Sequence, residues 1–158
     1  MKTLLLIIVV IVGGVYFFNH KQAITKTGIS AYNEIRLELT SGSRSVQLVS
    51  YIRRDSSESC EAIRVWWVES MITCAAATNC KVLKNQCVNE VSLQYQAMFD
   101  EKPSSTTYLK VENPVLGREG VMLFWGLNQD ESGELCKQMS QHIKSLAEKN
   151  PEIKYRCI

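Results

Sequence analysis

Apolar and polar positions divide this chain into an N-terminal apolar run and a body of shorter patterned segments. The run, residues 4–18, contains no charge and follows a single lysine. A secretory signal has an apolar stretch of roughly 7–15 residues and a small-residue cleavage motif, whereas a membrane-spanning helix needs about 20 apolar residues. Cleavage after Ala23 would put Lys21 where a small side chain is required. We therefore expect residues 1–22 to be a transmembrane anchor, with a cleaved signal as the alternative.

Residues 23–30 read as a short linker, and the body of the chain, residues 31–158, begins with strict alternation. Ile35, Leu37 and Leu39 alternate with charged residues, and residues 46–52 alternate in the same way. A period of two is typical of half-buried strands, and the Thr-Ser-Gly-Ser segment between the runs has turn chemistry. The pattern predicts a β-hairpin.

Residues 55–75 allow two interpretations. Asp55 and Glu58 match a capping box, and apolar residues recur behind them at helical spacing. Against this, the segment Ile-Arg-Val-Trp-Trp-Val is rich in β-branched and aromatic residues, which favour strands. We predict a strand over residues 62–72 and keep a helix as the alternative.

The remaining segments complete a recognisable order. Helical spacing of apolar residues predicts helices over residues 79–99 and from Ser132 to the Asn-Pro stop near the C-terminus. Alternating or apolar runs predict strands over residues 106–112, 121–127 and 153–158. From residue 62 the predicted order is β-α-β-β-α-β, the ferredoxin-like pattern. The expected fold class is therefore α+β, an antiparallel sheet with a preceding hairpin behind the anchor.

Cysteine usage agrees with export. The six cysteines are Cys60, Cys74, Cys80, Cys87, Cys136 and Cys157. An even count in an exported domain predicts a disulfide framework. The expected geometry pairs Cys136 with Cys157 and Cys74 with Cys80. It offers no natural third bridge: either Cys60 pairs with Cys157 instead, or the early segment is helical, or two thiols stay free.

Composition and motifs indicate little chemistry. A net charge of +2 and an exported position argue against nucleic acid, and the absence of an N-x-S/T sequon favours a bacterial periplasm. No Cys-x-x-Cys pair or nucleophile motif occurs, and His20 and His142 stand apart from the cysteines. We therefore expect no metal, no cofactor and no enzymatic activity, although a hydrolase with two distant carboxylates stays an alternative.

One face of the predicted sheet has a composition typical of binding surfaces. If Cys157 faces the helices, the opposite face carries Arg64, Trp66, Tyr108, Lys110, Lys154 and Arg156. Basic residues interleaved with aromatic ones suit an acidic protein partner or an anionic envelope polymer. The alternative is that the hairpin covers this face and that Trp66 belongs to the core.

These observations lead to one expected function and two alternatives. We expect a non-enzymatic binding protein of the bacterial envelope, anchored in the inner membrane through residues 4–18 with its domain in the periplasm. An inhibitor or immunity-type protein that neutralises a toxin or hydrolase fits the size and cysteine content. The alternatives are an accessory subunit of a secretion, pilus or division machine and a small periplasmic hydrolase.

Overall fold

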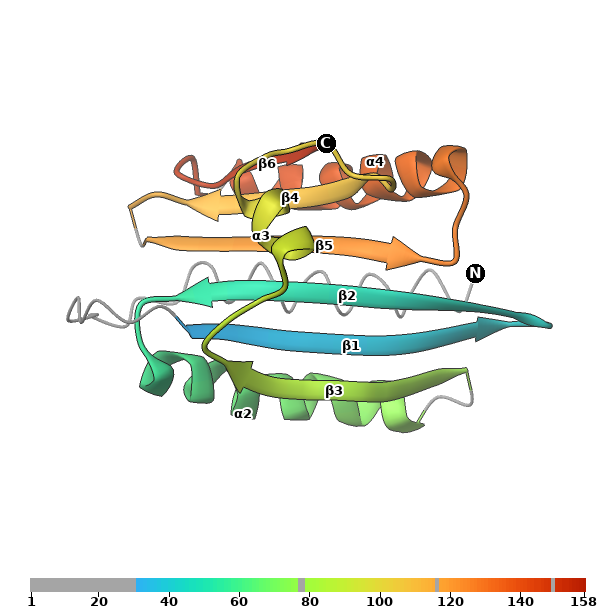
Figure 1. Cartoon of the computed structure of the whole chain (residues 1–158), viewed down its shortest axis with the longest axis horizontal. Helices are drawn as coiled ribbons and strands as arrows, with labels where there is room; N and C mark the ends of the chain where they lie inside the picture. The colour runs from blue at the N-terminus through green and yellow to red at the C-terminus, as the bar shows by residue number, and fades with distance from the viewer. Residues whose placement is uncertain (1–30, 77–78, 116, 149) are drawn as a thin grey trace.

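The computed structural model of the chain describes residues 31–76, 79–115, 117–148 and 150–158. Its elements, in chain order, are β1 (Ala31–Ser41), β2 (Arg44–Arg54), α2 (Ser57–Ala76), β3 (Cys80–Val88), α3 (Leu93–Phe99), β4 (Tyr108–Asn113), β5 (Arg118–Trp125), α4 (Gln129–Ala147) and β6 (Lys154–Cys157). Within these ranges the strands form one six-stranded antiparallel sheet in the order β3-β1-β2-β5-β4-β6 (Figure 1). The predicted α+β class with an antiparallel sheet is confirmed.

The predicted anchor, residues 1–22, and the linker, residues 23–30, lie outside the described residues. No helix in the described part of the chain is long and apolar enough to cross a bilayer.

The fold consists of two copies of the same ββαβ unit. In the first unit, the hairpin β1–β2 is followed by α2 and then by β3, which returns beside β1. In the second, the hairpin β4–β5 is followed by α4 and then by β6, which returns beside β4. The central pair β2–β5 joins the units, and α3 connects them along the chain. The sheet therefore has an approximate two-fold axis at its centre.

Strand register fixes which residues are equivalent in the two units. Cys87 lies opposite Asn33 in the first unit, and Cys157 lies opposite Leu109 in the second. The same correspondence places the axis at the central pair Tyr51–Val121. Asn33 and Leu109 are therefore equivalent, and so are the residues that follow them, Glu34 of β1 and Lys110 of β4.

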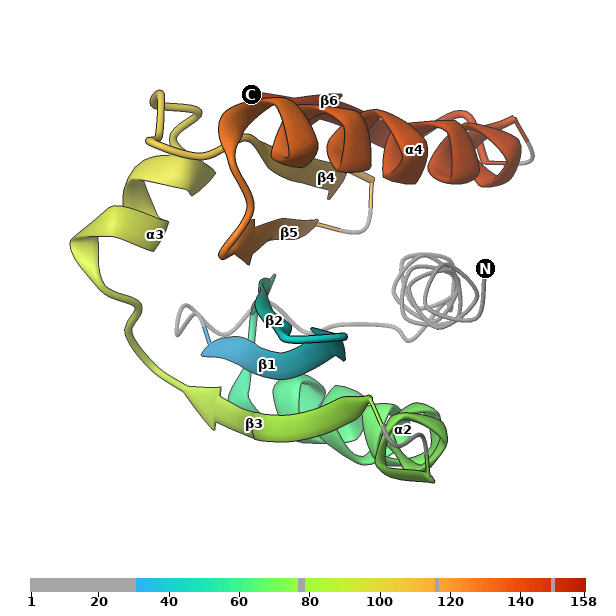
Figure 2. The same ribbon diagram turned by 90° about the vertical axis from the view of Figure 1, so that its right-hand side faces the viewer.

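Helices α2 and α4 cover one face of the sheet (Figure 2). Alternation in β1 turns Ile35, Leu37 and Leu39 toward this side, and the buried residues Ile63 of α2 and Met139 of α4 join the same apolar cluster. Period-two burial in strands and helical burial in α4 explain why the hairpin and the last helix were predictable from the sequence.

Helix α3 covers the centre of the opposite face. Its buried residues Tyr95, Met98 and Phe99 pack on a second cluster that includes Tyr51 and Tyr108. The Tyr51 and Tyr95 rings lie 4.6 Å apart between centroids. Helix α3 therefore covers the central strands on the side that α2 and α4 leave open (Figure 2).

Two predicted elements are wrong. Residues 62–72 lie within α2, since Ser56 accepts a hydrogen bond from the Ser59 amide at 3.1 Å and starts a helix there. Side-chain burial follows the helix, with Ile63 buried and Val65 60% exposed. Residues 79–99 hold the edge strand β3 and the short helix α3 in place of one long helix. The β-α-β-β-α-β order from residue 62 is therefore not confirmed.

Smaller differences concern the hairpin and the last helix. The hairpin β1–β2 continues the sheet beside β5, so it does not cover a sheet face. Helix α4 begins at Gln129, ahead of the predicted cap Ser132. Asn128 and Glu131 form a reciprocal cap there, each side chain accepting a hydrogen bond of 2.9 Å from the other residue's backbone amide.

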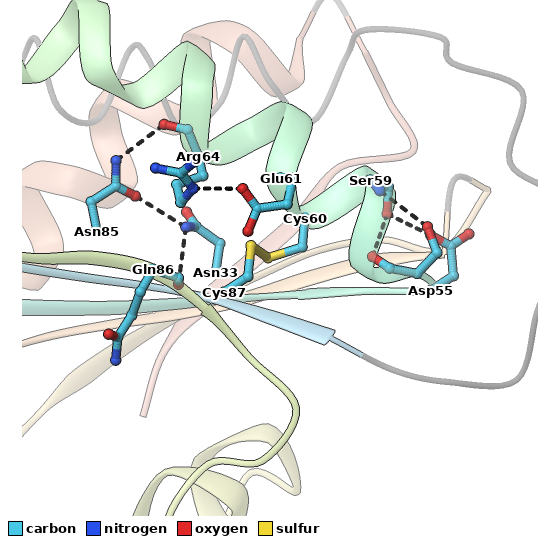
Figure 3. The surroundings of a disulfide bond; sticks show 10 residues. Asn33, Asp55, Ser59, Cys60, Glu61, Arg64, Asn85, Gln86 and Cys87 are labelled. Carbon is cyan, nitrogen blue, oxygen red and sulfur yellow. Dashed lines mark hydrogen bonds and ion pairs between the residues drawn. A yellow bond between two sulfur atoms is a disulfide. The ribbon is translucent and has the colours of Figure 1, made fainter.

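The predicted pairs Cys136–Cys157 and Cys74–Cys80 are confirmed. The third bridge joins Cys60 to Cys87, which becomes reachable because the early segment is helical (Figure 3). Cys60–Cys87 and Cys136–Cys157 are equivalent in the two units: each links the helix to the far end of the strand that follows it, with Cα atoms 6.0 Å apart. Each unit therefore ties its edge strand covalently to its helix.

Loss of the three bridges should cost different amounts of stability. In the chain-entropy description, a bridge stabilises more when it closes a longer loop, and the sequence separations are 27 for Cys60–Cys87, 21 for Cys136–Cys157 and 6 for Cys74–Cys80. Replacing both cysteines of a long-loop bridge by serine should lower the free energy of unfolding by about 3 kcal/mol, and the short-loop pair by about 2 kcal/mol. Urea unfolding of the three double variants measures the order, and a largest loss for Cys74–Cys80 would contradict it.

Two glycines should respond in opposite directions to alanine. Gly133 lies inside α4 with nothing near its missing Cβ, so Gly133→Ala should raise the free energy of unfolding by about 0.5–1 kcal/mol. Gly126 has φ +90°, and a Cβ there would lie 2.9 Å from the Ser45 carbonyl oxygen. Gly126→Ala should therefore lower the free energy of unfolding by at least about 1 kcal/mol. Thermal unfolding of the two variants checks the signs.

Candidate binding surface over β4 and β6

The structure brings together four of the six predicted surface residues. Lys110 pairs with Arg156 across β4 and β6, and Tyr108 and Lys154 lie on the same side of these strands. Their neighbours Leu109 and Val111 pack toward α4, so alternation turns the four residues to the opposite face. The prediction of this shared face follows from the correct assignment of β4, β6 and Cys157.

Arg64 and Trp66 do not join this surface. Both lie in α2, which packs beside β3 at the other edge of the sheet (Figure 1). Arg64 is paired with Glu61 at 2.6 Å, and its carbonyl oxygen accepts a hydrogen bond from Asn85 (Figure 3). The Trp66 side chain lies outside the described part of the structure, and its predicted place on a strand is wrong.

Lys110 is a buried hub and is not exposed to a partner. Its ammonium group donates to the Phe99 carbonyl oxygen at 2.7 Å and lies 2.6 Å from Glu119 and 3.0 Å from Glu101. The side chain is only 6% exposed. A cation that binds the last carbonyl of α3 also interacts favourably with the partial negative charge at the C-terminal end of that helix. Lys110 therefore fastens α3 and the segment after it to the sheet.

Tyr108 makes a second connection of the same kind. Its ring is fully buried and its hydroxyl donates to the Lys102 carbonyl oxygen at 2.9 Å. Burial raises the pKa of Tyr108, and the nearby Lys110 charge opposes that rise. The hydroxyl thus stays a neutral donor at ordinary pH. Tyr108 therefore holds the segment after α3 to β4 and is not itself exposed to a partner.

Lys154 and Arg156 are the members that solvent reaches. Both are exposed on β6, and Arg156 forms an ion pair with Glu101. An open pocket of about 370 Å³ lies over the two strands, and its lining defines the β4–β6 site: Lys110, Glu112, Lys154, Tyr155 and Arg156.

The charges around the β4–β6 site are mixed. They are Arg53, Lys110, Lys154 and Arg156 against Glu101, Glu112 and Glu119. Arg53 lies 2.5 Å from Glu119. Four cations against three carboxylates leave an excess of one positive charge, smaller than a count of the cations alone suggests.

The three carboxylates were missed by the sequence analysis. Glu112 and Glu119 alternate in step with Lys110 on neighbouring strands and lie opposite each other, so pairing the hairpin β4–β5 on paper would have found them. Glu101 gave no such signal. It follows α3 with φ 61°, a left-handed backbone conformation that no sequence pattern here indicated.

A second polar cluster occupies the equivalent place in the first unit. Buried Glu34 accepts hydrogen bonds from Arg36 at 2.6 Å, Tyr51 at 2.8 Å and Gln86 at 2.6 Å. Burial raises the pKa of Glu34, but the hydrogen bonds from Tyr51, Gln86 and Arg36 outweigh it and lower the pKa below its usual value. Burial also raises the pKa of Tyr51 to about 12. The buried carboxylate of Glu34 is therefore satisfied by neighbouring side chains of the first unit.

The described part of the chain contains no candidate metal site. The described residues contain no group of three or more histidine, cysteine, aspartate or glutamate side chains that could hold a metal ion. Comparison with known protein families, with characterised proteins and with solved structures finds no match.

Lys110 should be far more important for stability than its neighbour on the surface. Lys110→Met removes the cation between Glu101 and Glu119 and leaves the buried Glu119 with Arg53 as its ion-pair partner. Breaking such a pair by removing one member costs about 3 kcal/mol or more. Lys154→Met, on the exposed strand, should change the free energy of unfolding by less than about 0.5 kcal/mol.

Urea unfolding of both variants measures this difference. The double variant Lys110→Met with Glu119→Leu should recover part of the loss, because the buried Glu119 carboxylate is then removed together with its cation. Equal stability of the Lys110→Met protein and the unchanged protein would show that Lys110 is not a structural hub.

Proposed function

We propose that this protein is a non-enzymatic binding protein of the bacterial envelope that holds an acidic protein partner at the β4–β6 site. In this proposal residues 4–18 anchor the chain in the inner membrane and the disulfide-bonded domain lies in the periplasm. The partner is a toxin or hydrolase that the protein neutralises. Three disulfides support an oxidising compartment, because such bridges persist outside the cytosol.

The observation that carries the proposal is the exposure of Lys154 and Arg156 on a rigid strand. Buried Lys110 and Tyr108 lie behind them, and the Cys136–Cys157 bridge fixes the strand to α4. A preorganised charged surface loses little side-chain and backbone freedom when a partner docks, which favours specific binding. The excess positive charge there attracts an acidic surface and speeds encounter.

The apolar run also supports a second candidate, an accessory subunit of a secretion, pilus or division machine. In that case the anchor itself contacts other membrane segments, which an inhibitor does not require. Removal of residues 1–22 separates the two candidates: an inhibitor should still neutralise its target, whereas a machine subunit should lose its function.

Reversing the exposed charges should abolish partner capture. The full chain carrying Lys154→Glu and Arg156→Glu should retain its partner from envelope extract at least about thirtyfold less tightly than the unchanged chain, roughly 2 kcal/mol. A matched variant with Lys137→Glu and Lys144→Glu makes the same change of charge on exposed positions of α4.

Quantitative capture followed by identification of the bound protein makes the comparison. A partner that the α4 variant keeps and the β6 variant loses supports the proposal. Equal loss in both variants would indicate a general dependence on net charge, and equal retention would place the binding surface elsewhere.

A further inference from the structure

Strand β6 is an edge strand whose outward backbone groups can be assigned from its register. Tyr108 and Ile158 exchange two backbone hydrogen bonds, of 3.0 and 2.9 Å. Hydrogen-bonded pairs recur every second residue in an antiparallel ladder, so Arg156 and Lys154 also direct their backbone groups toward β4. The amides and carbonyls of Tyr155 and Cys157 therefore point away from the sheet.

These outward groups form a short open edge. Within the described residues, no strand lies beyond β6 and no backbone hydrogen bond joins Tyr155 or Cys157 to another segment. Two amide donors and two carbonyl acceptors at alternating positions are what an added antiparallel strand requires. An extended segment of a partner can satisfy them without any change in the fold.

Side chains next to the edge select the kind of strand. Lys154 and Arg156 project from alternate positions on the face opposite α4, and both are exposed. A strand beside β6 would place its own alternate side chains next to these two cations, because side chains on one face of neighbouring strands are in contact. Lysine on an edge strand discourages pairing with neutral or basic segments. Carboxylates at alternating positions would instead be favoured.

The same charges argue against a second copy of this chain as the occupant. Pairing β6 with another β6 would set Lys154 and Arg156 against each other. Pairing β6 with the opposite edge, β3, would set them against Lys81 and Lys84, which lie on the same face of the sheet. Strand β3 also carries an irregularity in its pairing at Arg36/Leu37, which disturbs the ladder along that edge.

We propose that β6 binds its partner by strand addition, taking up an extended segment that carries aspartate or glutamate at alternating positions. The added strand bonds the backbone of Tyr155 and Cys157, while its carboxylates contact Lys154 and Arg156. This inference rests on the proposed function and adds the mode of binding: the site recognises an acidic strand, in which backbone and charge act together.

Short capped peptides added to the full chain in mild detergent test the proposal. The first peptide alternates glutamate with valine, and the second replaces each glutamate by lysine. The third and fourth peptides keep the glutamates and carry N-methyl groups on backbone amides. In the third peptide only the amides along one edge are methylated, and in the fourth only those along the opposite edge. In an antiparallel strand whose glutamates lie on the side of Lys154 and Arg156, only one edge of the peptide can face β6, so one of the two methylated peptides should fail to bind.

The expected results separate backbone from charge. The glutamate peptide should bind at least about tenfold more tightly than the lysine peptide, and one methylated peptide should lose at least about tenfold in affinity. Amide exchange at Tyr155 and Cys157 should slow on binding. Lys154→Glu with Arg156→Glu should reverse the preference between the first two peptides. Lys81→Glu with Lys84→Glu on β3 serves as the matched control and should leave it unchanged.

Three outcomes would overturn strand addition. They are full binding by both methylated peptides, unchanged amide exchange at Tyr155 and Cys157, and no binding of the glutamate peptide at all. If partner capture still depends on Lys154 and Arg156 in any of these cases, the proposed function stands and only the mode of binding is wrong. If capture also fails to depend on them, both proposals are wrong.

Discussion

The pairing of β2 with β5 is the interaction on which this architecture depends. Without it, each ββαβ unit would be a three-stranded sheet covered by a helix on one face only, with a long inner edge unpaired. Pairing of β2 with β5 from Gln47 to Arg53 leaves neither inner edge unpaired. It also creates the continuous surface on which α3 packs. A sheet of this width with both faces covered can bury the apolar side of every central strand.

Two of the buried charged residues show how the sheet tolerates polar groups at its covered centre. Glu34 and Lys110 occupy equivalent positions in the two units, and each is surrounded by partners of the opposite kind. Burial of a single charge is expensive unless its hydrogen-bonding groups are satisfied. Here, the partners of Lys110 include the end of α3, so the same contacts that neutralise the charge also hold the helix in place.

Much of the fold could be predicted because burial on one side leaves a period in the sequence. The alternation of Ile35, Leu37 and Leu39 identified β1, and the spacing in α4 identified that helix. The segment Ala62–Val68 misled because β-branched and aromatic residues favour strands only where a sheet is available to receive them. On the surface, Lys154 and Arg156 were correctly placed together, but Lys110 was taken for a surface cation. Its burial depends on Glu101 and on the end of α3, which lie on other elements.

The internal symmetry has a consequence that concerns what a single chain can encode. Two identical subunits related by the same axis would have to carry the same residue at both hub positions, either two carboxylates or two ammonium groups. Because both units belong to one polypeptide, one hub can be Glu34 and the other Lys110, and the two edge strands can differ in length and charge. Because the two units are covalently joined, their edge strands can change independently. One edge strand can keep the residues that stabilise the fold while the other acquires residues that suit a binding partner.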